Sequence, residues 1–192
     1  SKPATRLAVN MITLSQKMKK RAQQNNNEEK APKRASIRDR LLQMEVEDLK
    51  QILPSSAVAD FPNSNMLHRF HVTIRPTDGY WRGGKFEFEV DVPEEYNISP
   101  PKVRCLTPLW HPNITEKGEV CLSLLRHSSI DPTGWTPSRS LKDVILGLDA
   151  LFGDLLNFDD PLNFEAAQQY LENKEGFAAT VREYIKRNTR NT

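Results

Sequence analysis

The residues best suited to chemistry in this chain are Cys121 and a motif that precedes it, His111-Pro112-Asn113. A thiol is the best nucleophile near neutral pH, because even an unperturbed cysteine is partly thiolate. The amide N–H₂ of an asparagine is a donor suited to the oxyanion that forms when a thioester is attacked. Neither a Cys-His-Asn protease signature nor a Cys-x-x-Cys redox pair surrounds Cys121. The pattern indicates acyl carriage on a cysteine, with transfer to an external nucleophile.

The elements that position these residues are expected to form one compact domain with a polar appendage. The chain has 192 residues, of which 38% are hydrophobic. No apolar run approaches the roughly 20 residues that span a bilayer, so we expect no membrane association. Only two cysteines are present, Cys105 and Cys121. That number argues against a disulfide framework and favours a reducing compartment, cytoplasmic or nuclear.

The net charge of +2 conceals two parts of opposite sign. Residues 1–40 contain 11 Lys/Arg and 3 Asp/Glu, whereas the rest of the chain contains 16 and 22. A basic arm on an acidic body suits nucleic acid, an anionic membrane or an acidic protein partner. We favour a protein partner, since Met11, Leu14 and Met18 recur at helical spacing among lysines. Residues 22–35 have little to bury and are predicted to be a linker.

The first half of the folded domain is predicted to be a helix followed by a meander of strands. Ser36 can cap the helix, with Asp39 three residues on. The apolar stripe that extends this helix to about residue 52 is Ile37, Leu41, Met44 and Leu49. Alternating apolar residues predict strands at 70–74 and 86–92, and a short run predicts a third at 102–106. Short loops join these strands, so the sheet is expected to be antiparallel.

The second half is predicted to be a functional loop followed by helices. Residues 108–137 show no sustained period, and loops of that length are usually functional. Ser140 and Asp143 predict a capping box, and the apolar face that follows it is Val144, Ile145, Leu148, Leu151, Phe152 and Leu155. Asp160-Pro161 is typical of an N-cap and first helical position. The core residues expected from a last helix, at about 174–187, are Phe177, Val181, Tyr184 and Ile185.

This arrangement resembles the ubiquitin-conjugating enzymes over about residues 36–188. The motifs that carry the resemblance are Pro100-Pro101-Lys102-Val103, His111-Pro112-Asn113, Cys121 at the family spacing, Trp135-Thr136-Pro137 and Asp159-Asp160-Pro161-Leu162. The resemblance implies an α+β ubiquitin-conjugating (UBC) fold, with an N-terminal helix, an antiparallel meander of about four strands, an active-site loop and C-terminal helices. It also implies a flexible basic arm, residues 1–35, and a catalytic core domain, residues 36–190.

Within the family, residues 123–135 and 154–163 are similar to the F-type carriers of neddylation. The resemblance implies that a heterodimeric activating enzyme, which consumes the ATP, loads a ubiquitin-like modifier on Cys121. A RING ligase would then direct the modifier to cullin lysines. No metal or organic cofactor is implied, and we expect a monomer that binds no nucleic acid. In that subgroup the arm docks on the activating enzyme, here through Met11, Leu14 and Met18, and an acetylated first methionine binds a co-ligase. Ten residues precede Met11 here, which departs from that pattern.

The resemblance also assigns roles around the thiol. Cys121 is expected to be the nucleophile, and Asn113 either an oxyanion donor or a residue that holds the loop. Asp160 would orient and desolvate the incoming lysine, although an aspartate before proline is also an ordinary helix cap. His111 and Pro112 are expected to shape the loop, because the thioester already carries the activation and needs no base on the cysteine.

The residues outside the reacting centre are expected to bind a ligase or to have structural roles. Ile98, Pro137 and Ser138 match the family's ligase-facing loops. Trp135 is expected to be mostly buried, and Cys105, inside an apolar strand, is expected to be a structural thiol.

Three other functions remain open at this point. The same fold could carry ubiquitin or another modifier, which depends on the activating enzyme that loads Cys121. A catalytically inert binding module of this fold is a second alternative, against which the presence of Cys121 counts. A cysteine hydrolase is the third, but no His/Asp pair at a recognisable spacing supports it.

Overall fold

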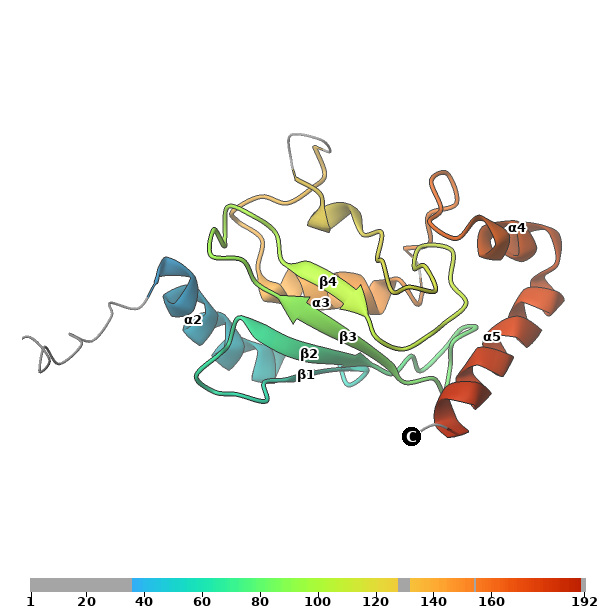
Figure 1. Ribbon diagram of the computed structural model, residues 1–192, viewed down its shortest axis with the longest axis horizontal. Helices are drawn as coiled ribbons and strands as arrows, with labels where there is room; N and C mark the ends of the chain where they lie inside the picture. The colour runs from blue at the N-terminus through green and yellow to red at the C-terminus, as the bar shows by residue number, and fades with distance from the viewer. Residues whose placement is uncertain (1–35, 128–131, 154, 191–192) are drawn as a thin grey trace, which may run out of the picture. The chain divides into compact units, whose positions relative to one another are not determined.

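The computed structural model describes residues 36–127, 132–153 and 155–190, which fall in one compact unit, 35–192. These residues form four helices, a short 3₁₀ turn and a four-stranded antiparallel sheet with the spatial order β1-β2-β3-β4 (Figure 1). The predicted α+β class and meander are therefore confirmed. None of the described helices is long and apolar enough to cross a membrane.

The sheet follows the alternation of its side chains. Its strands are β1 (Ala57–Asp60), β2 (Arg69–Ile74), β3 (Phe86–Asp91) and β4 (Lys102–Cys105). Every second residue of β2 and β3 is buried, and Val72 lies opposite Phe88 in the register. One face of the sheet therefore supplies the core. The sequence pattern did not locate β1, because four residues are too few to establish an alternation.

Helix α2 (Ile37–Ile52) begins at the predicted cap, where the Ser36 side chain accepts a hydrogen bond from the Asp39 backbone N–H at 3.0 Å. The predicted apolar stripe was partly wrong, because Ile37 and Met44 are 76% and 69% exposed. Leu49 is buried as predicted and Leu41 packs against the core, which also receives Leu42, a residue outside the predicted stripe. The inner face of α2 also carries the hydrogen-bonded polar residues Arg38 and Glu45. Apolar spacing alone therefore does not identify this face.

Helix α3 (Leu141–Ala150) crosses one face of the sheet (Figure 1). Ser140 and Asp143 form the predicted capping box. The expectation that Leu155 belongs to its apolar face was wrong, because the helix ends at Ala150 and Leu155 is 50% exposed.

Helices α4 (Phe164–Glu172) and α5 (Lys174–Arg190) pack on each other at the end of the sheet opposite α2 (Figure 1). The prediction that Asp160-Pro161 begins a helix was wrong. The cap of α4 is Asn163, whose side chain accepts a hydrogen bond from the Ala166 N–H at 3.0 Å. The last helix buries Phe177 and Val181 as predicted. Asp160 is therefore a loop residue, and its carboxylate is not used as a cap.

Candidate active site

Cys121 lies on the loop that leads from the Ile114–Val120 bridge into the 3₁₀ turn η1 (Ser123–Leu125). Its backbone N–H donates to the Asn113 carbonyl at 2.8 Å, which brings the two halves of the predicted motif together. The thiol is free and the residue is partly exposed. A half-buried thiol on a fixed backbone can form a covalent bond with a substrate that approaches from solvent.

His111 holds this loop from inside the core. It is fully buried, its Nε2 lies 2.8 Å from the Leu151 carbonyl, and its Nδ1 accepts a hydrogen bond from the Asn113 N–H at 2.9 Å. This pattern corresponds to a neutral ring that donates from Nε2. The ring stacks on Trp81 with centroids 4.6 Å apart. Burial lowers the pKa of His111 to about 4, so the ring is neutral at physiological pH. Both ring nitrogens are occupied, which suits the loop-shaping role.

Asn113 is also buried, and its side chain reaches across 44 residues of sequence to the backbone of Asn157. The amide N–H₂ donates to the Asn157 carbonyl at 2.6 Å, and the amide oxygen accepts from the Asn157 N–H at 2.9 Å. These two bonds occupy both ends of the amide. The geometry therefore favours the loop-holding alternative for Asn113 over direct contact with an oxyanion.

The segment that Asn113 holds is the one that presents Asp160. The side-chain oxygen of Asn157 accepts from the backbone N–H groups of Asp159 and Asp160, at 2.9 and 3.4 Å. The carboxylate of Asp160 points outward, with 78% of its side chain exposed. Asn113, Asn157 and Asp160 thus form a connected series from the cysteine loop to an exposed carboxylate. Sequence reasoning missed Asn157, because hydrogen bonds to the backbone of a residue leave no motif in the sequence.

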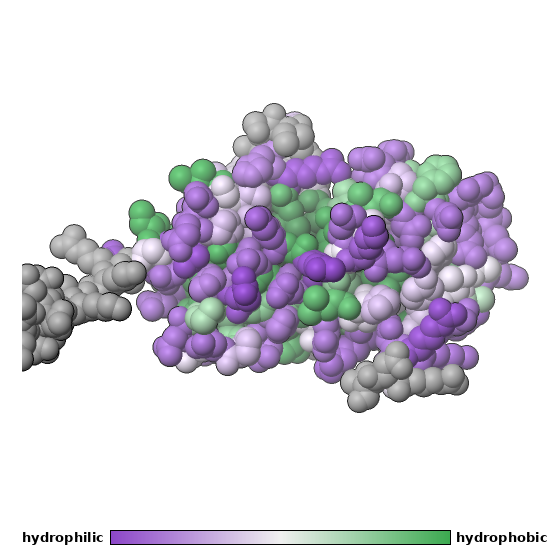
Figure 2. Space-filling model, viewed as in Figure 1, coloured by the Kyte–Doolittle hydropathy of each residue, from purple (hydrophilic) through white to green (hydrophobic). Residues whose placement is uncertain are grey.

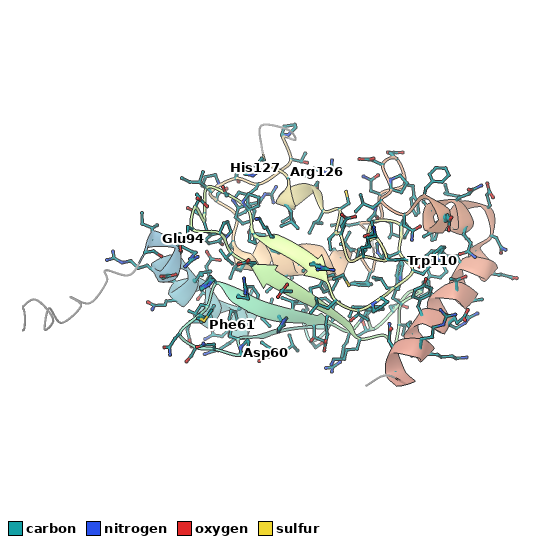
Figure 3. All side chains as sticks on the ribbon, viewed as in Figure 1. Asp60, Phe61, Glu94, Trp110, Arg126 and His127 are labelled. Atoms are coloured by element: carbon teal, nitrogen blue, oxygen red, sulfur yellow. The ribbon has the colours of Figure 1, made fainter. Side chains whose placement is uncertain are left out.

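Arg126 is the second residue that sequence reasoning missed. Its Nη2 lies 2.8 Å from the Cys121 sulfur and 3.5 Å from an oxygen of Asp160. The residue follows η1 directly (Figure 3). A signal was available, since Arg126 is the only Lys or Arg between Cys121 and Arg139. The structure therefore brings a cation into contact with both the nucleophile and the carboxylate.

The three residues assigned to ligase contacts lie on two loops that are tied together. The Asn97 side chain donates to the Pro137 carbonyl at 2.6 Å, and the Trp135 ring nitrogen donates to the Asn97 carbonyl at 2.8 Å. Trp135 is buried, as predicted, while Ile98 is 74% exposed. Pro137 and Ser138 are exposed as well. Figure 2 shows exposed hydrophobic residues near the end of the unit where α2 begins. An exposed apolar side chain on hydrogen-bonded loops is suited to protein binding.

The remaining predicted residues do not take part in this centre. Cys105 is buried, and burial raises the pKa of its thiol to about 12, which fits a structural residue. Met11, Leu14 and Met18 lie outside the described residues. Within the part of the chain that the structure describes, no three His, Cys, Asp or Glu side chains gather in a way that could hold a metal ion.

The arrangement is suited to acyl transfer through the thiol. A partly exposed sulfur, a nearby cation and an exposed carboxylate can accommodate a thioester and an incoming amine. Among the described residues no base is bonded to the sulfur, and both ring nitrogens of His111 have other partners, so the arrangement does not match a cysteine hydrolase.

Comparison with known proteins agrees with the family that the sequence motifs resemble. The family model described as ubiquitin-conjugating enzyme matches residues 41–185. The chain is 53% identical over 185 residues to the NEDD8-conjugating enzyme UBE2F of Homo sapiens, which covers 94% of this chain and all of that protein. It is 54% identical over 185 residues to UBE2F of Bos taurus, with the same coverage. It is 47% identical over 158 residues to the NEDD8-conjugating enzyme ubc-12 of Caenorhabditis elegans, covering 80% of this chain and 88% of that protein.

Proposed function

The chain belongs to the ubiquitin-conjugating enzyme family, and from its similarity to NEDD8-conjugating enzymes we propose that it is a conjugating enzyme of neddylation, a transferase that carries NEDD8 on Cys121. The observation that carries this proposal is the partly exposed thiol of Cys121, fixed to Asn113 on the family's active-site loop. The relatives named above are NEDD8-conjugating enzymes and are about half identical to it over nearly all of its length.

The first step is thioester exchange. The Cys121 thiolate attacks the thioester between NEDD8 and its activating enzyme, the new carbon–sulfur bond forms, and the thiolate of the activating enzyme leaves. ATP is consumed earlier, by the activating enzyme, so this chain needs no cofactor of its own. The number of thioester bonds is unchanged, so the reaction is nearly balanced in free energy.

The second step is transfer to lysine. A lysine amine attacks the thioester carbonyl, an amide bond forms, and the electron pair of the broken bond returns to Cys121. Asp160 orients the amine, and Asn113 holds the segment that carries Asp160. Bringing amine and thioester together is itself a large part of the catalysis.

The remaining partners follow from the same proposal. A RING ligase binds the surface around Ile98, Pro137 and Ser138 and presents a lysine of a cullin. The arm docks on the heterodimeric activating enzyme through Met11, Leu14 and Met18, and it can also engage a co-ligase. The enzyme acts as a monomer in the cytoplasm and nucleus, without metal, membrane or nucleic acid.

A single-turnover charging assay tests the proposal. The full chain is mixed with ATP and either the NEDD8 or the ubiquitin activating enzyme, each with its own modifier, and the products are separated on reducing and non-reducing gels. We expect a thiol-sensitive adduct only with the NEDD8 pair, absent in Cys121→Ala. An adduct with ubiquitin alone would keep the mechanism and reassign the pathway. No adduct with either pair, from folded protein, would support an inert binding module.

A further inference from the structure

The structure places a cation against the reacting sulfur, a feature that the roles described above do not use. Arg126 Nη2 is 2.8 Å from the sulfur of Cys121, within hydrogen-bonding reach. The same nitrogen is 3.5 Å from Oδ2 of Asp160. One guanidinium group therefore contacts both the nucleophile and the carboxylate that faces the acceptor.

The backbone of Arg126 is fixed on both sides, so the position of the side chain does not depend on a loose loop. Its N–H donates to the Ser123 carbonyl at 2.9 Å, which closes η1. Its carbonyl accepts from the Trp135 N–H at 2.7 Å, and Trp135 is buried. Arg126 follows the 3₁₀ turn directly, and its side chain returns to the sulfur of Cys121, five residues earlier in the sequence.

The sulfur carries negative charge at two moments of the proposed reaction. In charging, the nucleophile is the Cys121 thiolate, which loses that charge when the carbon–sulfur bond forms. In transfer, the amine nitrogen bonds to the carbonyl carbon, the carbon–sulfur bond breaks, and the electron pair goes to the Cys121 sulfur. The nitrogen releases its proton to solvent. A donor that carries full positive charge stabilises a thiolate at each of these moments.

We propose that Arg126 is a catalytic residue of this enzyme, whose guanidinium stabilises the Cys121 thiolate as nucleophile in charging and as leaving group in transfer. This inference rests on the proposed function. Once Cys121 carries the modifier its sulfur is neutral, and Arg126 keeps its contact with Asp160. The incoming lysine, a second cation before it loses its proton, replaces Arg126 at that carboxylate. The guanidinium of Arg126 lies against the sulfur as the thiolate leaves.

The first test measures the thiol alone and needs no modifier. The full-length wild type, Arg126→Gln and Arg126→Lys are treated with iodoacetamide near neutral pH, and alkylation of Cys121 is followed by peptide mass spectrometry. The matched control is Arg69→Gln, which also removes a positive charge and an ion pair, with Asp91 at 3.3 Å. The buried thiol of Cys105 reports on folding in each sample, because it reacts only when the core opens.

We expect Arg126→Gln to slow alkylation of Cys121 by about tenfold, less than the roughly 100-fold typical of a donor in a water-excluded site, because Arg126 is partly exposed. Arg126→Lys should recover most of the rate, since it keeps the charge. Arg69→Gln should behave as wild type. If Cys105 becomes reactive in Arg126→Gln, then Arg126→Met, which keeps an unbranched stem without charge, takes its place. Wild-type alkylation in the neutral variants, or a lysine variant no faster than them, would overturn the proposal.

The second test measures the two steps with the NEDD8 activating enzyme. Single-turnover charging, and discharge of the thioester to free lysine, should each slow by about tenfold in Arg126→Gln and recover in Arg126→Lys. Unchanged rates of both steps in Arg126→Gln would overturn the role of Arg126. Failure of the wild type to charge would overturn the proposed function instead, and the alkylation comparison would still decide whether Arg126 stabilises the thiolate.

Discussion

The side-chain amide of Asn113 forms two hydrogen bonds with the backbone of Asn157, donating at 2.6 Å and accepting at 2.9 Å. The backbone of Asn113 is bonded to Cys121, and the side chain of Asn157 is bonded to the backbone of Asp160. These bonds therefore fix the distance between the loop of Cys121 and the segment that presents Asp160. The importance of this residue lies in that connection.

Asn113→Ala should leave charging of Cys121 largely intact and slow transfer to lysine by roughly 100-fold. The reason is that the segment carrying Asp160 loses its two bonds to the cysteine loop. Asn157→Ala is the variant to compare with it. This variant keeps both hydrogen bonds between the Asn113 side chain and the backbone of residue 157, but it removes the side-chain oxygen that accepts from Asp159 and Asp160. Single-turnover charging and discharge are measured for both variants.

The two variants separate the two roles that Asn113 can have. Slow transfer in both variants is expected if Asn113 acts by positioning Asp160. Slow transfer in Asn113→Ala alone would contradict positioning through the Asn157 side chain and leave contact with the oxyanion as the alternative. An equal loss of charging and transfer in Asn113→Ala would mean that the residue is needed for folding of the loop.

His111 predicts a pH dependence of stability. Burial lowers its pKa to about 4 from an ordinary value of 6.5. Between these two pH values the unfolded chain therefore binds a proton at His111, whereas the folded protein does not. The free energy of unfolding is therefore highest above pH 6.5 and falls as the pH falls toward 4, by up to about 3 kcal/mol from this residue. Urea unfolding across this pH range should show the loss. His111→Gln should be less stable near neutral pH and show a shallower slope; an unchanged slope would contradict the assignment.

Tyr96 predicts a local contribution to stability. Its hydroxyl donates to the carboxylate of Glu45 on α2, which also accepts from the Leu141 N–H at 2.7 Å at the start of α3. Burial raises the pKa of Glu45 and of Tyr96, yet both groups are hydrogen-bonded. Tyr96→Phe should lower the free energy of unfolding by about 1 kcal/mol. Tyr184→Phe, whose hydroxyl bonds Glu116 at the surface, should change it by about 0.5 kcal/mol or less. Chemical denaturation compares the two, and equal losses would argue against the buried bridge.

Ile98 predicts an effect that depends on the ligase. Ile98→Ala should slow RING-stimulated transfer by about tenfold, because truncation of an exposed apolar anchor weakens binding. Discharge to free lysine without ligase should not change, since Ile98 touches none of the reacting groups. Leu171→Ala on α4, which removes a side chain 62% exposed, serves as the control and should change neither rate. A loss of ligase-free discharge in Ile98→Ala would contradict this assignment.

Deletion of residues 1–35 tests the proposed docking arm. The remaining chain begins at the cap of α2 and contains every described helix and strand, so it should fold. Charging by the activating enzyme should slow by about tenfold, because a docking contact is lost, whereas alkylation of Cys121 should not change. Unchanged charging would make the arm a passive tail.

Much of the fold was predictable because it depends on neighbouring residues. The alternation in β2 and β3, the caps at Ser36 and Ser140, and the spacing of Phe177 and Val181 are local patterns, and each was confirmed. The face of α2 was not predictable in this way. Ile37 and Met44 have the right spacing for a core stripe but are exposed, whereas Leu42, outside that stripe, is fully buried.

The sequence by itself determined the chemistry: a thiol after a His-Pro-Asn motif, on a long loop of a domain whose helices and meander are specified by local patterns. Only the tertiary structure decided how that chemistry is arranged. Asn113 meets Asn157 across 44 residues, and Arg126 reaches both Cys121 and Asp160. These contacts form only when distant loops are packed together, because hydrogen bonds to backbone groups and single side-chain contacts impose no periodicity that a sequence pattern can reveal.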